Sequence, residues 1–136
     1  MFSNYFDNEP PILVGTLIWR KHKERNEDPL DLSGYYLYTT NKWYAYVPEV
    51  IFVNKKIKVL IVDDFAMSGD FIYGFKEYLL KNGFNDSNIK TACVITTNVA
   101  INNNKAPNYY WKTVDSDDFY FPWGKASTSC HLKLYK

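Results

Sequence analysis

The sequence predicts an α/β fold, with an open and mostly parallel sheet flanked by helices. Residues 59–62 (VLIV) form an apolar run of the length and composition of a buried strand. An amphipathic stretch follows, in which Phe71, Phe75 and Leu79 recur at helical spacing. A second strand-like run comes next, at residues 89–97. A strand, a helix and a strand in this order form by default a right-handed crossover between parallel strands.

The residues before this unit predict shorter elements. Residues 12–15 follow two prolines and end at a glycine, which indicates a short buried strand. Residues 16–28 are highly charged, which indicates a loop or a short exposed helix. Residues 35–40 are rich in aromatic side chains and threonine, as is typical of a strand. Residues 41–58 are mixed and are interrupted by a proline, with a possible short strand at 50–53.

The residues after the first predicted strand carry further boundary signals. Ser68 is placed as the N-cap of the helix, and Gly83 lies just beyond its expected end. The asparagine-rich residues 98–108 predict a connection, residues 119–121 a short strand, and residues 131–135 a possible edge strand.

Length and composition limit the class of protein. A chain of 136 residues fits a single domain, here residues 1–136. A net charge of +1 argues against a nucleic-acid binder that works by bulk electrostatics, and no apolar run is long enough to span a bilayer. Cys93 and Cys130 have neither metal nor redox spacing, and Cys93 reads as a buried thiol. We therefore expect a cytoplasmic protein with no membrane partner.

Two adjacent carboxylates and a small-residue loop follow the first predicted strand. Ala66, Met67, Ser68 and Gly69 would form a loop at a helix N-terminus, where backbone amides and the helix dipole favour a phosphate. The pair Asp63-Asp64 precedes this loop, and carboxylates accept hydrogen bonds from hydroxyl groups. A sugar phosphate satisfies both halves of the pattern. The plainer alternative is a strand that ends in solvent-facing acids before a capped helix.

These residues resemble those of a known family. The segment VLIVDDFAMSG, residues 59–69, looks like the phosphoribosyl-pyrophosphate loop of type I phosphoribosyltransferases. The segment APNYYW at residues 106–111, followed by FPW at 121–123, is similar to a motif pair of the purine-type (hypoxanthine-xanthine-like) members. The resemblance implies a short, divergent phosphoribosyltransferase type I-like core. It also implies transfer of ribose 5-phosphate from phosphoribosyl pyrophosphate to a purine-type base, with release of pyrophosphate.

The resemblance also implies roles for individual residues. Asp63 and Asp64 match the catalytic acids that hold the ribose hydroxyls, and they are the expected ligands of Mg²⁺. Ala66, Met67, Ser68 and Gly69 match the loop that binds the 5′-phosphate. Residues 41–46 fall where the family has a loop that closes over the site. The base would stack in the region of Phe119, Tyr120 and Trp123.

Several positions depart from the family's pattern and keep a second hypothesis open. Phe71 stands where the family usually has threonine, and Met67 stands where many purine members have aspartate. Residues 16–20 lack the glycine expected of a pyrophosphate loop. The alternative is a catalytically degenerate protein of the same fold, which acts as a nucleotide or phosphoribosyl sensor or as a subunit of a larger bacterial complex. For the enzyme we expect a homodimer or a subunit of a complex, with phosphoribosyl pyrophosphate and a nucleobase as ligands.

Overall fold

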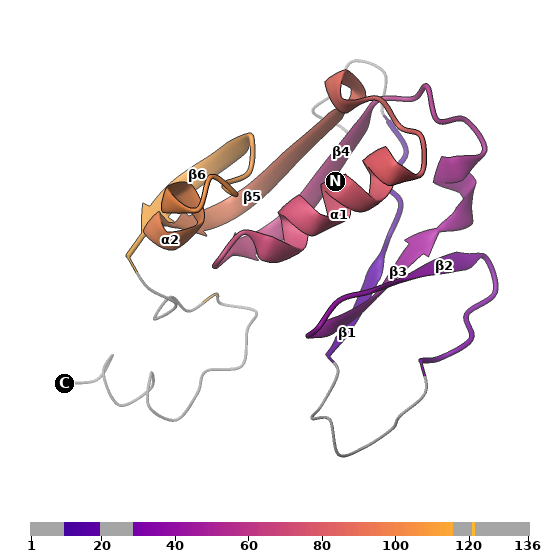
Figure 1. The fold of residues 1–136 in the computed structure, drawn as a ribbon, viewed down its shortest axis with the longest axis horizontal. Coiled ribbons are helices and arrows are strands. Elements are labelled where there is room, and N and C mark those ends of the chain that lie inside the picture. The colour runs from indigo at the N-terminus through magenta and orange to yellow at the C-terminus, as the bar shows by residue number, and fades with distance from the viewer. Residues whose placement is uncertain (1–9, 20–28, 116–120, 122–136) are drawn as a thin grey trace. The chain divides into compact units, whose positions relative to one another are not determined.

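The computed structural model describes residues 10–19, 29–115 and 121, which are drawn in colour in Figure 1. The backbone groups into two compact units, Met1–Ile57 and Lys58–Lys136. The expectation of a single domain stays a prediction. Among the described residues, no helix is long and apolar enough to cross a bilayer.

The first unit is built on an antiparallel sheet with the strand order β1-β3-β2. Its strands are β1 (Thr16–Trp19), β2 (Tyr35–Thr39) and β3 (Trp43–Pro48), and the 3₁₀ helix η2 (Glu49–Phe52) follows. The central strand β3 supplies the buried residues Ala45, Tyr46 and Val47. The turn between β2 and β3 is closed by Thr40, whose hydroxyl oxygen accepts a hydrogen bond of 2.9 Å from the Trp43 amide. The strand predicted at residues 35–40 is therefore confirmed.

Three predictions in this unit are wrong, and one of them is the loop or exposed helix expected from residue 16 on, because Thr16–Trp19 form β1. The described backbone at residues 12–15 is irregular, with Ile12, Leu13 and Val14 exposed, and the first strand begins only at Thr16. Pairing with β3 decides this start, because Thr16 lies opposite Tyr46 in the ladder. The predicted strand at 50–53 is instead η2 and the residue after it, where the Val53 amide donates to the Val50 carbonyl over 3.3 Å. Residues 20–28 lie outside the described part of the chain.

The second unit contains a parallel sheet with the strand order β4-β5-β6. Its strands are β4 (Val59–Ala66), β5 (Ile89–Thr97) and β6 (Tyr109–Val114). The helix α1 (Asp70–Lys81) and the 3₁₀ helix η3 (Asp86–Asn88) connect β4 to β5, and α2 (Asn98–Asn102) precedes β6. Figure 1 shows α1 running along the sheet. The mixed α/β class and the parallel β4–α1–β5 crossover are confirmed. The chain also has an antiparallel sheet, so the predicted fold holds only in part.

Packing against the sheet explains where α1 lies and where it ends. Ile72 and Leu79 are buried on the helix, as are Ile61 of β4 and Ile89 and Ile95 of β5. Beyond the helix the backbone turns at Gly83, whose φ of 93° suits glycine, and the Phe84 amide donates to the Leu79 carbonyl over 3.2 Å. This confirms Gly83 as the residue past the helix end.

The segment after β5 is more regular than its asparagine-rich composition predicts. Residues 98–102 form α2, because the side chain of Thr97 caps this helix and accepts a hydrogen bond of 3.2 Å from the Ala100 amide. The aromatic and β-branched run YYWKTV then forms β6, which the sequence reasoning treated only as part of a motif. Of the strands predicted at 119–121 and 131–135, only Phe121 lies within the described residues.

Candidate ligand-binding site

The two adjacent acids lie within β4, since this strand continues past its apolar half. The ladder with β5 runs on through Phe65 opposite Ile95 and Ala66 opposite Thr96. Side chains alternate along a strand, so Asp63 and Asp64 point to opposite faces of the sheet. Asp63 is half-buried and Asp64 is exposed. The strand predicted at residues 59–62 therefore extends to Ala66, and the two acids expected to follow it lie within it on opposite faces.

Asp63 sits in an environment that disfavours its charge. Burial is the main cause that raises the pKa of its carboxyl group from 3.8 to about 6. The negative charge of Asp64 acts in the same direction, whereas the Asp64 amide, which donates to Asp63 Oδ1 over 2.9 Å, opposes it. A carboxyl group with this pKa changes its charge close to neutral pH, as acid–base and ligand-binding groups commonly do.

The buried neighbour of Asp63 on β5 is Cys93. Its thiol donates a hydrogen bond of 3.0 Å to the Ile95 carbonyl. Burial, together with the charges of Asp63 and Asp64, raises the pKa of the thiol to about 11. Cys93 is therefore a neutral packing residue at physiological pH, as predicted, and it offers no nucleophile to the site.

The loop from β4 to α1 consists of Met67, Ser68 and Gly69, and Gly69 is the N-cap of the helix. Gly69 has a φ of 75°, and a Cβ atom placed on it would lie 2.2 Å from the Lys105 carbonyl oxygen. Glycine is thus required both by the backbone conformation and by the close approach of the segment after α2. The Met67 carbonyl accepts a hydrogen bond from the hydroxyl of Thr97, which ties this loop to the end of β5.

Ser68 does not cap α1 as predicted. Its hydroxyl donates a hydrogen bond of 2.9 Å to Asp70 Oδ2, and the Asp70 amide donates back to Ser68 Oγ over 3.3 Å. The other carboxylate oxygen of Asp70 lies 2.6 Å from the Lys105 ammonium, which stands 5.8 Å from the ring centroid of Tyr73. The chain's own carboxylate therefore holds the hydroxyl group that was expected to bind a phosphate.

This Ser68–Asp70–Lys105 network is the part of the site that sequence reasoning missed. Asp70 gives a weak signal, since an acid in the first turn of a helix suits the helix dipole and opposes a bound anion. Lys105 gives none, because it lies 35 positions further along the chain and comes close only through the fold.

The residues predicted to contact a base cannot be placed. Phe119, Tyr120 and Trp123 lie outside the described residues. Their neighbour Phe121 is described, and its ring makes an edge-to-face contact with Phe65, with 6.2 Å between ring centroids and an interplanar angle of 71°. Phe121 therefore lies against β4 on the face of the strand that also carries Asp63.

Residues 41–46, which the family resemblance suggests as a closing loop, mostly belong to a strand. Trp43, Tyr44 and Tyr46 are part of β3, the central strand of the first unit. Backbone hydrogen bonds on both sides hold a central strand, so residues 43–46 form a strand rather than a closing loop.

The described side chains fit a magnesium ion only in part. Carboxylate oxygens are suitable Mg²⁺ ligands, and this ion commonly uses one or two of them together with water and the phosphates of a substrate. Asp63 and Asp64 lie on opposite faces of β4, so a single ion would receive a carboxylate from only one of them. Among the residues with described positions, no group of three or more His, Cys, Asp or Glu side chains could hold a metal ion. The magnesium expectation stays a prediction.

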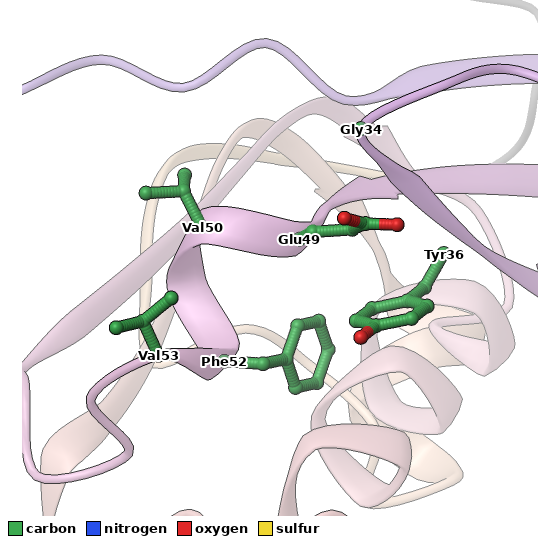
Figure 2. Close-up of a pocket in the computed structure, with 6 residues that line it drawn as sticks. All are labelled: Gly34, Tyr36, Glu49, Val50, Phe52 and Val53. Atoms are coloured by element: carbon green, nitrogen blue, oxygen red, sulfur yellow. The ribbon is translucent and has the colours of Figure 1, made fainter.

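Neither of two hollows in the described residues is lined by Asp63 or Asp64. In the first unit, a shallow hollow of about 500 Å³ is lined by Gly34, Tyr36, Glu49, Val50, Phe52 and Val53. Figure 2 shows the rings of Tyr36 and Phe52 in this hollow, where their centroids are 5.1 Å apart at an interplanar angle of 83°. The only charged group in that lining is a carboxylate, which does not suit an anion. In the second unit, a hollow of about 170 Å³ lies between α1 and the segment before β6, where Tyr73, Lys76 and Lys105 contribute to its wall.

Comparison with known proteins gives a distant likeness to a solved structure. No family model matches the chain, and no curated protein matches it. Among solved structures, the crystal structure of purine phosphoribosyltransferase from Pyrococcus horikoshii Ot3 is similar, with 26% sequence identity and a TM-score of 0.46. The match covers 55% of this chain and 49% of that one, so the chain spans about half the length of that protein.

Proposed function

We propose that this chain binds phosphoribosyl pyrophosphate at the carboxyl end of β4 and transfers its ribose 5-phosphate to a purine-type base, releasing pyrophosphate. The observation that carries the proposal is the junction of β4 and α1, where a parallel strand that carries two acids in its second half leads through a glycine-containing loop into a helix. In open α/β sheets, ligands bind outside the carboxyl ends of the strands. The resemblance of residues 59–69 to the phosphoribosyl-pyrophosphate loop selects this ligand among sugar phosphates.

Asp63 and Asp64 would bind the ribose. Each carboxylate accepts hydrogen bonds from hydroxyl groups, which suits the hydroxyls of a ribose. Ribose hydroxyls that donate to Asp63 would favour its charged form. Because its pKa is about 6 without ligand, affinity should rise as the pH increases through this value.

The loop Met67–Gly69 and the first turn of α1 would bind the 5′-phosphate. Backbone amides at a helix N-terminus and the helix dipole favour an anion at this place. Asp70 counteracts this attraction, and its charge is balanced by Lys105 at 2.6 Å. In this proposal the phosphate takes the Ser68 hydroxyl from Asp70, and Lys105 continues to neutralise the displaced carboxylate.

The reaction would require little covalent participation of the protein. The sugar passes through an oxocarbenium-like state, as in glycoside hydrolysis, so its orientation and the exclusion of water decide the rate. Mg²⁺, when bound, would offset the charge of the departing pyrophosphate. The base would stack near Phe119, Tyr120 and Trp123.

A second candidate function is a sensor that binds the same ligand without turning it over. The Ser68–Asp70–Lys105 network favours it, because a site closed by the chain's own carboxylate binds a phosphate less readily. Met67 and Phe71 also favour it, since both lack the polar groups that the family commonly uses at these positions.

Incubation with phosphoribosyl pyrophosphate, Mg²⁺ and hypoxanthine, guanine or xanthine separates these candidates by pyrophosphate release. For the enzyme we expect release that is lost in Asp63→Asn and Asp64→Asn and retained in Asp86→Asn. Asp86 is an exposed acid that pairs with Lys76 at 2.7 Å, so it controls for the loss of an acid elsewhere. Absence of release, combined with a higher melting temperature in the presence of phosphoribosyl pyrophosphate, would support the sensor. Absence of both effects would contradict both candidates.

A further inference from the structure

The side chain of Asn108 joins the start of β6 to β5. Its Oδ1 atom accepts a hydrogen bond of 2.9 Å from the Thr91 amide and one of 3.1 Å from the Thr91 hydroxyl. The Asn108 amide in turn donates to the Thr91 hydroxyl oxygen over 3.0 Å. Thr91 is buried, so these three bonds satisfy polar groups that would otherwise lack a partner inside the fold.

These bonds extend the β5–β6 ladder by one rung. The ladder starts at Ala92 opposite Tyr109, and its paired residues are 17 positions apart. Thr91 and Asn108 have the same separation. Pro107 comes directly before Asn108 and has no amide hydrogen, so the backbone cannot donate at that position. The Asn108 side chain therefore closes a rung at the place where the backbone ladder ends.

The other side chains of β6 specify its register only weakly. Residues 109–111 are two tyrosines and a tryptophan, so large aromatic side chains point to both faces of the sheet. A slip of one residue moves every side chain of a strand to the other face, and a strand without a distinct apolar face resists such a slip poorly. A polar pair at one point of the ladder removes this ambiguity, because the buried Thr91 would lose its partner in any other register.

We propose that Asn108 is a positioning residue, which fixes the register of β6 on β5 and thereby the place where Phe121 meets β4. Asp115 directly follows β6, and its carboxylate accepts a hydrogen bond from the Asn98 side chain, so the far end of the strand is also in one defined position. Phe121 contacts the ring of Phe65, with 6.2 Å between the centroids. A slip of one residue moves a strand by about 3.3 Å, which is enough to break such a ring contact.

The consequence for activity rests on the proposed function. Phe65 and Asp63 lie on one face of β4, and the residues expected to contact the base follow β6 in the chain. The loop that would bind the 5′-phosphate follows β4, whose neighbour in the sheet is β5 and not β6. Loss of the β6 register should therefore weaken binding of the base and leave binding of phosphoribosyl pyrophosphate unchanged.

Nuclear magnetic resonance of the full chain tests the register without any ligand. In Asn108→Ala, the Thr91 amide should exchange its hydrogen at least about tenfold faster, and the nuclear Overhauser effects between the rings of Phe65 and Phe121 should be lost. Asn108→Asp keeps the acceptor oxygens and should retain both signals. The control is Asn102→Ala, which removes an exposed asparagine at the last position of α2 and should change neither.

Thr91→Val is a milder variant that decides the case in which Asn108→Ala does not fold. It removes the two bonds of the hydroxyl and keeps the bond from its own amide to Asn108. The amide of residue 91 should then exchange about threefold faster, because the remaining bond has lost its neighbours.

Pyrophosphate release with hypoxanthine as the base tests the consequence for activity. Asn108→Ala should raise the KM for hypoxanthine roughly fivefold and leave the KM for phosphoribosyl pyrophosphate within about twofold, and Asn108→Asp should restore the wild-type values. A general loss of structure would instead impair both substrates alike.

Three results would overturn the inference. They are unchanged exchange of the Thr91 amide in Asn108→Ala, ring contacts of Phe121 that persist in this variant, and an equal rise of both KM values. A wild type that releases no pyrophosphate would refute the enzyme alone, and the two magnetic resonance signals would still decide the role of Asn108.

Discussion

Asp63 should lower the stability of the fold at neutral pH, so Asp63→Asn should stabilise the protein there. Asparagine has the same shape, and its side-chain oxygen can still accept the hydrogen bond from the Asp64 amide, which is 2.9 Å long in the structure. The substitution therefore removes the buried charge and little else. If Asp63→Asn stabilises the fold, the carboxyl group of Asp63 serves function rather than folding.

The magnitude follows from the pKa. Burial raises the pKa of Asp63 from 3.8 in the unfolded chain to about 6 in the folded one. The folded state then holds the proton more tightly, so stability from this group is fully present below pH 4 and is lost as the pH rises through 6. Each pKa unit corresponds to about 1.4 kcal/mol, which gives a cost of up to about 3 kcal/mol above pH 6.

Urea unfolding of the wild type and Asp63→Asn at pH 4.0 and pH 7.5 measures this difference. The two proteins should have similar free energies of unfolding at pH 4.0, and the variant should be more stable by about 2–3 kcal/mol at pH 7.5. Asp86→Asn is a control of opposite sign, because its pairing with Lys76 lowers the pKa of Asp86. That variant should lose a small stabilisation at pH 7.5 that is absent at low pH.

An equal effect of Asp63→Asn at both pH values would refute this reasoning. So would a variant that is less stable than the wild type at pH 7.5, because the charged carboxylate would then be stabilised by the fold rather than destabilised.

Three further predictions concern the loop and its surroundings. Gly69→Ala should destabilise the fold by about 3 kcal/mol or more in urea unfolding. The control Gly34→Ala has a similar φ of 81° but nothing within 4 Å of the added Cβ, so it should cost only about 1 kcal/mol. Equal costs would contradict the close contact with the Lys105 carbonyl. Thr97→Val should lower the free energy of unfolding by about 1–2 kcal/mol, because it removes the α2 cap and the hydrogen bond to the Met67 carbonyl. The matched Thr96→Val removes only a 3.4 Å hydrogen bond to the Ala66 carbonyl and should cost less than half as much. Asp70→Asn should tighten the binding of inorganic phosphate or ribose 5-phosphate about three- to tenfold by calorimetry, and unchanged or weaker binding would show that its carboxylate does not compete with the anion.

Local pattern was sufficient for some elements of the fold. Residues 89–97 and the helix that includes Phe71 and Leu79 were predictable because their apolar spacing matches the period of the element they form. Gly83 was predictable because a positive φ after a helix favours glycine. Strand β6 was predictable in principle, since aromatic and β-branched residues favour strands, but its residues were interpreted as a motif.

The elements that were predicted wrongly depend on partners distant in sequence. Residues 12–15 have the composition of a strand, yet the ladder with β3 starts at Thr16. Beta propensity reports how well a residue fits a sheet and does not say which residues find a neighbouring strand. The same holds for the end of β4, which extends through Asp63 and Asp64 because β5 continues beside it.

The sequence by itself determined the order of strand and helix, the two acids and the glycine at their junction, and so the place in the fold where a ligand should bind. Only the tertiary structure decided that the acids face opposite sides of the sheet, that Asp63 has its pKa raised to about 6, and that Asp70 and Lys105 close the loop. Periodicity and turn chemistry are local and can be read along the chain. Burial and the pairing of charges 35 residues apart arise from packing, which the order of residues does not display.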